Sequence, residues 1–477
     1  MKSPLLILLS FLFLQLPITY AQNFPDATWE KVKSPTFYGW DQAKLDALEE
    51  YTTDKTATTG MLIIQDGRII YEYGNVTENS YIASCRKSVL AMLYGKYVAN
   101  KTINLEQSLA DLDITYEGLL LEIERQATVK DILSSRSGVY LPAANGGDMI
   151  HLAPERGTVK PGELWVYNNW DFNMAGYIFE KQTQRNIYDE IGAQFAVPMQ
   201  MEDWDRSIQE KEGNPLITDV LAYHINFSAR DMARLGWLML NKGKWKKQQI
   251  IPEFWVEEMT QPSTTFAEVD KIAPFVKNEF NKVAYGYMWW LLHEPKHKAL
   301  EKAYSAQGAW GQNITIIPAM NAVVVIKTNN LYLRQKGDHS YMLDQIARAY
   351  SPTLGQELQP LAAYLTKDYI GPFTLAYKKM LPKSATINFQ IAINKLAYHY
   401  LHEVKDYDKA LTLFQLNVSQ HPSSWLVYDG LAEAYFMMED YDNALKNYEK
   451  ALQLNTENEW DNNPTVSYII ERLKKRK

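Results

Sequence analysis

Cysteine is almost absent from this sequence: Cys85 is the only one among 477 residues. A single cysteine cannot form a disulfide within the chain, so the fold must be stabilised by packing rather than by cross-links. The 46% of apolar residues suffice for a large core, and the length allows two or three domains, which excludes a disordered or fibrous chain. Cys85 has no histidine near it in the sequence, so we interpret it as a small buried residue rather than a nucleophile.

Long apolar runs and an excess of positive charge are lacking as well. The first residues, MKSPLLILLSFLFLQLPITYAQ, contain Lys2, an apolar run too short to span a bilayer, and Thr19 and Ala21 at the spacing of a signal peptidase site. We expect residues 1–21 to be a signal peptide cleaved near Ala21, and the mature protein to be secreted or periplasmic without a membrane span. The net charge of −7 argues against nucleic-acid binding and favours a small or neutral substrate.

Two common catalytic motifs are also missing. The sequence has no G-x-S-x-G elbow and no glycine-rich phosphate loop, which argues against α/β-hydrolases and nucleotide-binding proteins. The segment HEPKH, from His293 to His297, has the letters of a zinc-protease motif, but Pro295 would fall inside the helix that the motif requires. We interpret the segment as a connecting loop and expect no metal site.

β-rich segments stand near both ends of the region before residue 351. Residues 60–74, GMLIIQDGRIIYEYG, predict a hairpin that turns at Asp66-Gly67. Three later segments predict strands, at residues 285–292, 313–318 and 321–328. Strands from both ends of one domain indicate a single antiparallel sheet.

Helical periodicity fills most of the remaining sequence in this region. It runs from about Ser84 to Leu240 and is broken by a Gly/Pro/Asn-rich stretch at residues 137–148, which we expect to be a loop beside a site. Further helices are expected from Asp41 and over residues 339–350. The pattern predicts an α+β domain over residues 22–350, with an antiparallel sheet flanked by helices and an all-helical subdomain.

The last part of the chain contains an internal repeat. Tyr407, Ala410 and Phe414 recur 34 residues later as Tyr441, Ala444 and Tyr448. This period is typical of the tetratricopeptide helix pair. We expect a helical connector at residues 351–390 and two such repeats with a cap helix at residues 391–477, an all-α array that could bind a protein partner.

Ser84 and Lys87 stand three residues apart at the start of an expected helix, in ASCRKSVLAMLYGKY. Residues at this spacing share a helix face, so the lysine amine can reach the serine hydroxyl. The first turn also presents free N–H groups that favour developing negative charge. A lysine acts as a base only when burial or nearby positive charge lowers its pKa. The pair is therefore either a nucleophile with its base or an accidental polar helix start.

Two further segments favour the catalytic alternative. The segment GELWVYNNWDFNMAG contains Tyr167 and Asn169; a tyrosine near a lysine can act as phenolate or proton relay, and an asparagine amide can orient a substrate carbonyl. The segment YSAQGAWGQNITI places Gly308 and Gly311 beside a strand, where substrate can approach the backbone and an N–H can point at an oxyanion.

These three segments, in this order and in this layout, resemble the serine β-lactamase and penicillin-binding-protein superfamily, over roughly residues 36–350. The likeness is greatest to a class C-like group that includes esterases, D-amino-acid peptidases and 6-aminohexanoate-dimer hydrolases. The resemblance implies that Ser84 is the acylated nucleophile, Lys87 its base, Tyr167 a proton shuttle and Asn169 a positioning group. It also implies an oxyanion hole formed by the N–H groups of Ser84 and Ala309.

The third motif departs from that of penicillin-recognising members. They have Lys or His at its first position, where this chain has Ala306, followed by Gln307 and Gly308. A cation there helps to bind the β-lactam carboxylate, so a β-lactam is less expected than another ester, amide or peptide. Besides Gln307 and Gly308, the aromatic residues near the motifs are candidates for contacting substrate, with core packing as the alternative: Tyr140, Trp170, Tyr287, Trp289 and Trp310.

The sequence thus predicts an exported serine hydrolase that needs no metal or organic cofactor. The alternative is a binding protein of the same fold that has lost turnover and acts as a sensor or scaffold through its repeats. The joint presence of Ser84, Lys87, Tyr167 and Asn169 argues for the enzyme.

Overall fold

The computed structural model describes residues 23–116, 118–277, 280, 282–328, 339–351, 389–455, 470, 473 and 474. The expected signal peptide lies outside these residues. So do most of the expected connector and most of the expected cap helix.

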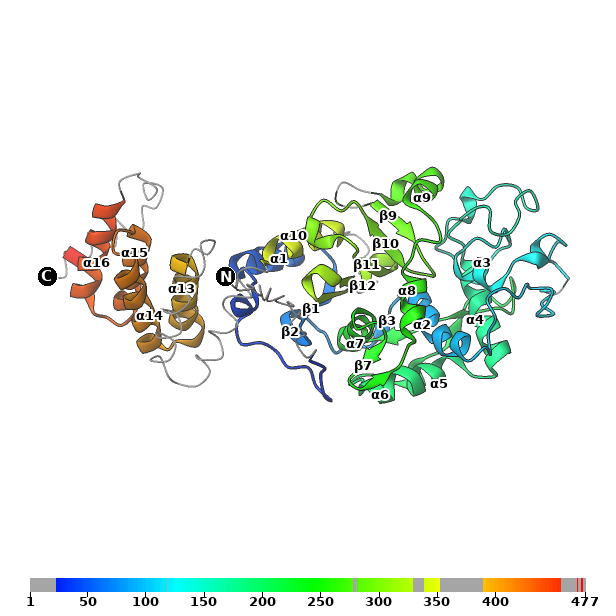
Figure 1. The fold of residues 1–477 in the computed structure, drawn as a ribbon, viewed down its shortest axis with the longest axis horizontal. Coiled ribbons are helices and arrows are strands. Elements are labelled where there is room, and N and C mark those ends of the chain that lie inside the picture. The colour runs from blue at the N-terminus through cyan, green and yellow to red at the C-terminus, as the bar shows by residue number, and fades with distance from the viewer. Residues whose placement is uncertain are drawn as a thin grey trace, which may run out of the picture.

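The centre of the first domain is an antiparallel sheet, seven-stranded in the described part of the chain (Figure 1). Its order is β2-β1-β13-β12-β11-β10-β9, so the strands from the two ends of the domain lie side by side. This confirms the single sheet expected from the sequence. The bounds are β1 Thr58–Gln65, β2 Arg68–Gly74, β9 Lys282–Tyr285, β10 Trp290–His293, β11 Tyr304–Gly308, β12 Gln312–Ile317 and β13 Ala322–Thr328.

Alternating side chains of β1 point to two separate cores, because successive residues of a strand face opposite sides of the sheet. Leu62 and Ile64 belong to the larger core, which contains the helical subdomain. Met61 and Ile63 belong to the smaller core, which lies under the first and last helices of the domain. The expected hairpin between β1 and β2 is confirmed, with Asp66 and Gly67 both at positive φ in its turn.

Helices cover both faces of the sheet. The smaller core is closed by α1 (Gln42–Lys55) and α10 (His339–Ala349), which lie beside each other in Figure 1. On the other face α7 (Ala229–Leu240) packs on β12 and β13, and α2 (Cys85–Ala99) packs against β11. The remaining helices of this domain are α3 Val129–Leu133, α4 Asn169–Thr183, α5 Ile187–Ile191, α6 Val197–Met199, α8 Glu253–Met259 and α9 Phe266–Ile272.

Short two-stranded ribbons connect these helices. They pair β3 (Ser80–Tyr81) with β6 (Asn226–Phe227), β4 (Lys211–Glu212) with β5 (Ala222–Tyr223), and β7 (Lys244–Trp245) with β8 (Gln248–Gln249). The architecture is the α+β fold that the sequence predicts.

One expected strand is wrong. Residues 285–292 form the end of β9, a turn and the start of β10, not one continuous strand. Trp290 pairs with Tyr285, and Met288 adopts a φ of 61° inside the turn. The whole segment is buried on both sides of the turn, so its apolar run shows no break in the sequence that would reveal the reversal.

The C-terminal region consists of antiparallel helix pairs (Figure 1). Its helices are α13 Phe389–Tyr398, α14 Tyr407–Gln420, α15 Trp425–Met437 and α16 Tyr441–Leu454. The repeated residues have equivalent roles, because Ala410 and Phe414 are buried in one core cluster and Ala444 and Tyr448 in the next. Within the residues that the structure describes, no helix of the chain is long and apolar enough to cross a membrane.

Candidate active site

Ser84 occupies the N-cap position of α2 and is half-buried, whereas the residues that follow it are buried. The preceding residue, Ala83, adopts a left-handed φ of 48°. Such a conformation is unfavourable for a residue with a side chain and persists only where the surroundings impose it. In the described part of the chain the backbone N–H of Ser84 donates to no carbonyl. The strained turn thus presents both the Ser84 hydroxyl and a free N–H at the helix start.

Lys87 lies one turn into α2 and is only 1% exposed. Its Nζ donates hydrogen bonds to Tyr167 Oη and to Asn169 Oδ1, both at 2.7 Å. The Ser84 side chain lies close enough to the Tyr167 hydroxyl to lower the pKa of that phenol. The structure therefore brings together the four residues that the sequence predicts to be catalytic.

The environment of this cluster lowers the pKa of Lys87 well below its usual value. Burial is the main cause and the positive charge of Arg86 the second, while Asp148 acts in the opposite direction. Burial also raises the pKa of Tyr167, and the nearby Ser84 side chain opposes this only in part. Both shifts favour the uncharged forms, a neutral amine beside a protonated phenol. A neutral amine that donates to Tyr167 and Asn169 keeps one lone pair free to accept a proton.

Asn169 is the first residue of α4 and is held from two sides. Its Nδ2 donates to the carbonyl of Gly146 at 2.8 Å, and its backbone N–H donates to Asp148 Oδ2 at 3.1 Å. The preceding Asn168 caps the helix by accepting from the N–H of Trp170. These contacts fix the Asn169 carbonyl toward Lys87, and they place the Gly/Pro/Asn-rich stretch beside the site, as the sequence predicts.

The ring of Tyr167 is fixed by aromatic neighbours. It stacks on Trp290 of β10 with ring centroids 5.5 Å apart and contacts Phe172 of α4 at 4.8 Å. The Lys87 ammonium position lies 4.1 Å from the centroids of both Tyr167 and Phe172. The aromatic wall excludes water from the lysine and holds the phenol oxygen in place.

Gly308, the last residue of β11, brings the third motif against the residues before Ser84. A Cβ at this position would lie 2.6 Å from the carbonyl oxygen of Ile82 and 3.1 Å from Cβ of Ala83. Only glycine allows this approach without displacing backbone. The following Ala309 is exposed, and Trp310 is 48% exposed with a φ of 61°. Ala309, one of the two expected oxyanion residues, thus follows directly on a strand that passes beside the nucleophile.

The first two residues of the third motif differ in exposure. Ala306 is fully buried on β11, opposite Ile314 of β12, and Gln307 is half-buried. No charged side chain therefore stands at the position where penicillin-recognising relatives have a cation.

Three aromatic residues that were candidates for the acyl pocket fill the core instead. Trp170 contacts Tyr116, Tyr287 packs on Trp255, and Trp289 packs edge-on against Tyr304. Each is at most 2% exposed, so the alternative role of core packing applies. Of the other two candidates, Tyr140 is half-buried beside the loop of the site and Trp310 is exposed.

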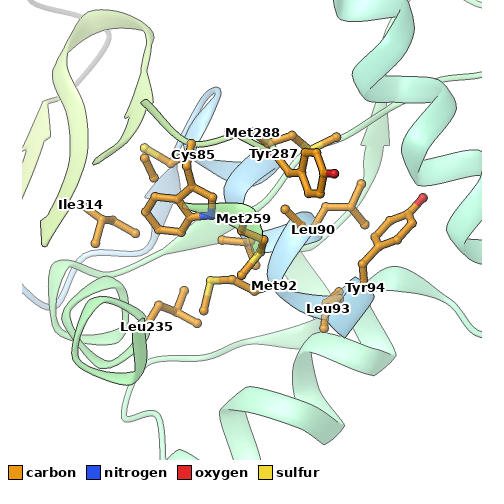
Figure 2. Close-up of a cluster of buried hydrophobic side chains, with 14 of the residues drawn as sticks. Cys85, Leu90, Met92, Leu93, Tyr94, Leu235, Met259, Tyr287, Met288 and Ile314 are labelled. Carbon is orange, nitrogen blue, oxygen red and sulfur yellow. The ribbon is translucent and has the colours of Figure 1, made fainter. Parts of the chain in front are cut away.

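Cys85 points away from solvent into the larger core. Figure 2 shows it among apolar side chains that include Met259, Met288 and Ile314. Burial raises the pKa of its thiol, which keeps it protonated and unreactive. The interpretation of Cys85 as a small buried residue is confirmed.

The HEPKH segment does not form a helix. His293 ends β10, Glu294 has a positive φ, and His297 caps a short 3-10 turn. Among the described residues there is no group of three or more His, Cys, Asp or Glu side chains placed to hold a metal.

Sequence reasoning missed Arg86, which lies between the nucleophile and the lysine. The side chain is 1% exposed and donates to Asn173 Oδ1 on α4. A signal existed, because an arginine inside an otherwise buried helical run is unusual and requires a reason. Asn173 itself follows Asn169 by one helical turn, so both amides face the site.

Comparison with solved structures gives low sequence identity over most of the first domain. One similar structure is a proposed 6-aminohexanoate-dimer hydrolase from Bacillus anthracis. It is 19% identical in sequence with a TM-score of 0.49, and the match covers 69% of this chain and 89% of that chain. A second is a penicillin-binding-protein homologue from Caulobacter crescentus, 15% identical with a TM-score of 0.49, covering 67% and 98%. A third is EstCE1, a hydrolase with promiscuous acyltransferase activity. It is 14% identical in sequence with a TM-score of 0.48, and the match covers 65% of this chain and 97% of that chain. No curated protein sequence matches the chain significantly.

Family models match both parts of the chain. The tetratricopeptide repeat model matches residues 430–458, within the second of the two helix pairs. The beta-lactamase model matches residues 45–348, which spans the sheet, both cores and all four residues around Ser84. On this match, and with the expected fold present, the chain belongs to the beta-lactamase family.

Proposed function

We propose that this protein is an exported serine hydrolase that cleaves an ester or amide through an acyl-enzyme on Ser84. Membership of the beta-lactamase family supports serine hydrolase activity in general. The observation that carries the proposal is the position of Lys87 Nζ, 2.7 Å from both Tyr167 Oη and Asn169 Oδ1, with the Ser84 side chain close enough to lower the pKa of Tyr167.

In the first half-reaction the Ser84 hydroxyl attacks the substrate carbonyl. A bond forms between Oγ and the carbonyl carbon, and the hydroxyl proton passes to the neutral amine of Lys87. The N–H groups of Ser84 and Ala309 stabilise the negative charge on the carbonyl oxygen. The bond to the leaving group then breaks, and the leaving group receives a proton from Lys87 through the Tyr167 hydroxyl.

In the second half-reaction water replaces the leaving group. The neutral Lys87, acting through Tyr167, accepts a proton from the water as its oxygen attacks the acyl carbon. The bond to Ser84 Oγ then breaks, Oγ regains a proton, and the carboxylic acid leaves. The directions of the two pKa shifts support Tyr167 as a relay that gives one proton while taking another, rather than as a resting phenolate.

The third motif supports a substrate without an essential carboxylate next to the scissile bond. Ala306 is buried and uncharged, so it cannot form the ion pair that β-lactam recognition uses. Gln307 and the exposed Trp310 offer an amide and an aromatic surface instead. We therefore favour a neutral ester, amide or peptide bond over a β-lactam. The repeats are proposed to bind a protein partner, which their match to the tetratricopeptide repeat model supports.

The test is covalent labelling with a fluorophosphonate, in which Ser84 Oγ bonds to phosphorus and fluoride leaves. We expect the wild-type protein to gain one adduct, located on Ser84 by peptide mass spectrometry, and to hydrolyse members of a panel of chromogenic esters and amides. Ser84→Ala should abolish both activities. Secretion of the full-length protein, with the mature N-terminus measured by mass spectrometry, tests cleavage near Ala21.

Ser88→Ala is the matched control, because Ser88 lies on the same helix and its hydroxyl donates to the Met288 carbonyl rather than to the site. This variant should label like the wild type. Wild-type protein that is folded, yet neither labels nor turns over any ester, amide or β-lactam, would show that the protein is a binding protein instead.

A further inference from the structure

Arg86 immediately precedes the proposed base in the chain, and its guanidinium is buried. Its side chain extends from α2 toward α4 and β5, where Nη2 donates to Asn173 Oδ1 at 3.3 Å. The guanidinium carbon lies 4.6 Å from the ring centroid of Tyr223. The side chain is 1% exposed, so neither water nor substrate reaches it in this structure.

No carboxylate pairs with Arg86 among the residues that the structure describes. Its Nε and Nη1 have no hydrogen-bond partner, and the groups of negative character around it are the hydroxyls of Tyr223 and Tyr81. Arg234 is buried to the same degree but is compensated, since it donates to the carbonyls of Met199 and Ala27 at 2.7 and 2.8 Å and contacts Glu202 at 3.4 Å. The charge of Arg86 therefore has no acidic partner in the described part of the chain, and tyrosine side chains, those of Tyr223 and Tyr81 foremost, are what favour its charged form.

A buried cation without a partner is strongly unfavourable, and such groups concentrate at functional sites. A guanidinium does not give up its proton in proteins, so a neighbouring group must respond to its charge. Lys87 follows it in the chain and is equally buried. The titratable groups that face Lys87 are Arg86 and Cys85 from α2, Tyr167 from the segment before α4, and Asp148 from the loop beside Asn169. Asp148 and, to a smaller extent, Cys85 oppose the effect of Arg86 on the Lys87 pKa.

We propose that Arg86 is a positioning residue whose permanent charge keeps Lys87 in its neutral form, so that Ser84 can be activated at neutral and mildly acidic pH. The inference rests on the proposed function, because it concerns the base of that reaction. The pKa of Lys87 supports it: the charge of Arg86 lowers this pKa, second only to burial. The guanidinium acts through Lys87 and does not touch substrate.

The test is the rate of fluorophosphonate labelling of Ser84 between pH 5 and 9, in the wild type, Arg86→Met and Arg86→Lys. Only neutral Lys87 accepts a proton, so the rate falls as pH drops through the Lys87 pKa. Removing the Arg86 charge should raise that pKa. The acid limb, which is the low-pH part of the curve of labelling rate against pH, should then move upward by about one pH unit, a roughly tenfold loss of rate on this limb. Arg86→Lys retains a cation and should restore the position of the limb.

Thermal unfolding provides the second readout. Because no carboxylate is left unpaired, Arg86→Met should unfold at the same or a higher temperature than the wild type while it loses activity. A purely structural arginine would give the reverse, a lower unfolding temperature with an unmoved acid limb. Failure of Arg86→Met to fold would likewise overturn the inference, since it would show that the charge is needed for packing.

Lys96→Met is the matched control, because Lys96 is a cation of the same helix that is exposed and paired with Glu190. Its acid limb should not move. If Arg86 instead bound a substrate carboxylate, Arg86→Met would raise KM for anionic substrates alone and leave the limb in place, which would refute the inference. A wild-type protein that does not label at all would refute the proposed function and not this inference alone.

Discussion

The Nζ of Lys87 lies 2.7 Å from the Oη of Tyr167, and the nearby Ser84 side chain lowers the pKa of that same phenol. These three residues come from two distant parts of the chain and define the path that we propose for the proton. The path begins at the nucleophile and ends at a buried amine whose pKa is lowered. Two of its members lie on α2, and the third is fixed by its contact with Trp290.

Lys87→Arg should be inactive although it retains the positive charge. A guanidinium cannot accept the Ser84 proton, so we expect labelling and ester hydrolysis to fall by about 10²–10⁴-fold, the usual contribution of a general base. The measurement is the second-order labelling rate on folded protein, checked by circular dichroism. Lys96→Arg, an exposed change on the same helix, should retain the wild-type rate; an active Lys87→Arg would mean that another group takes the proton.

Tyr167→Phe removes one oxygen and keeps the ring contacts with Trp290 and Phe172. Loss of the relay should lower turnover by about 10²-fold or more, with little effect on the unfolding temperature. Tyr304→Phe is the control, because Tyr304 is also buried and its hydroxyl donates only to the Met239 carbonyl. Steady-state kcat for an ester substrate distinguishes the two variants, and equal losses in both would contradict a specific role for Tyr167.

Cys85 should resist iodoacetamide in the native protein and react only after denaturation, because it is fully buried and burial raises its thiol pKa. Cys85→Ala should still be labelled on Ser84 by fluorophosphonate, with a stability loss of about 1 kcal/mol. Peptide mass spectrometry measures both outcomes. If iodoacetamide alkylates Cys85 in the native protein and this stops fluorophosphonate labelling, the assignment of Ser84 as the nucleophile is wrong.

Gly308→Val tests the close approach of β11 to the nucleophile turn. The added Cβ would meet the Ile82 carbonyl at 2.6 Å, which must move the strand or the turn. We expect a loss of about 1–3 kcal/mol in the free energy of unfolding and a fall in labelling rate, because Ala309 moves relative to Ser84. Gly192→Ala, whose Cβ meets only Trp204 Nε1 at 3.5 Å, should change neither quantity. Denaturant titration and labelling provide the two measurements.

The sequence predicts the fold well, because turns, strand alternation and helix periodicity depend on local spacing. The Asp66-Gly67 turn, the alternation in β1 and the three-residue interval from Ser84 to Lys87 are all set within a few residues. Contacts between distant segments are harder to foresee. The turn at Met288 interrupts a segment that is apolar on both sides, so the pattern predicts one strand where two exist.

The aromatic residues show the same limit. Trp170, Tyr287 and Trp289 stand beside catalytic motifs in the sequence, yet each points into the core. Proximity along the chain does not determine which way a side chain faces once the helix or turn is placed. Arg86 is hard to identify as a site residue from the sequence. Its spacing does not reveal that its buried guanidinium lacks a carboxylate partner in the described part of the chain.

The chain leaves the first domain on the side of the sheet away from its chemistry. After α10 the N–H of Ser351 donates to the carbonyl of Gly39 at 2.8 Å, in the layer of the smaller core, whereas α2 with Ser84 belongs to the larger core across the sheet. A force applied to the chain after Ser351 would therefore act on the smaller core and not on the face of the sheet that carries Ser84. If the repeats tether the enzyme to a partner, the tether joins the first domain on the face of the sheet opposite Ser84.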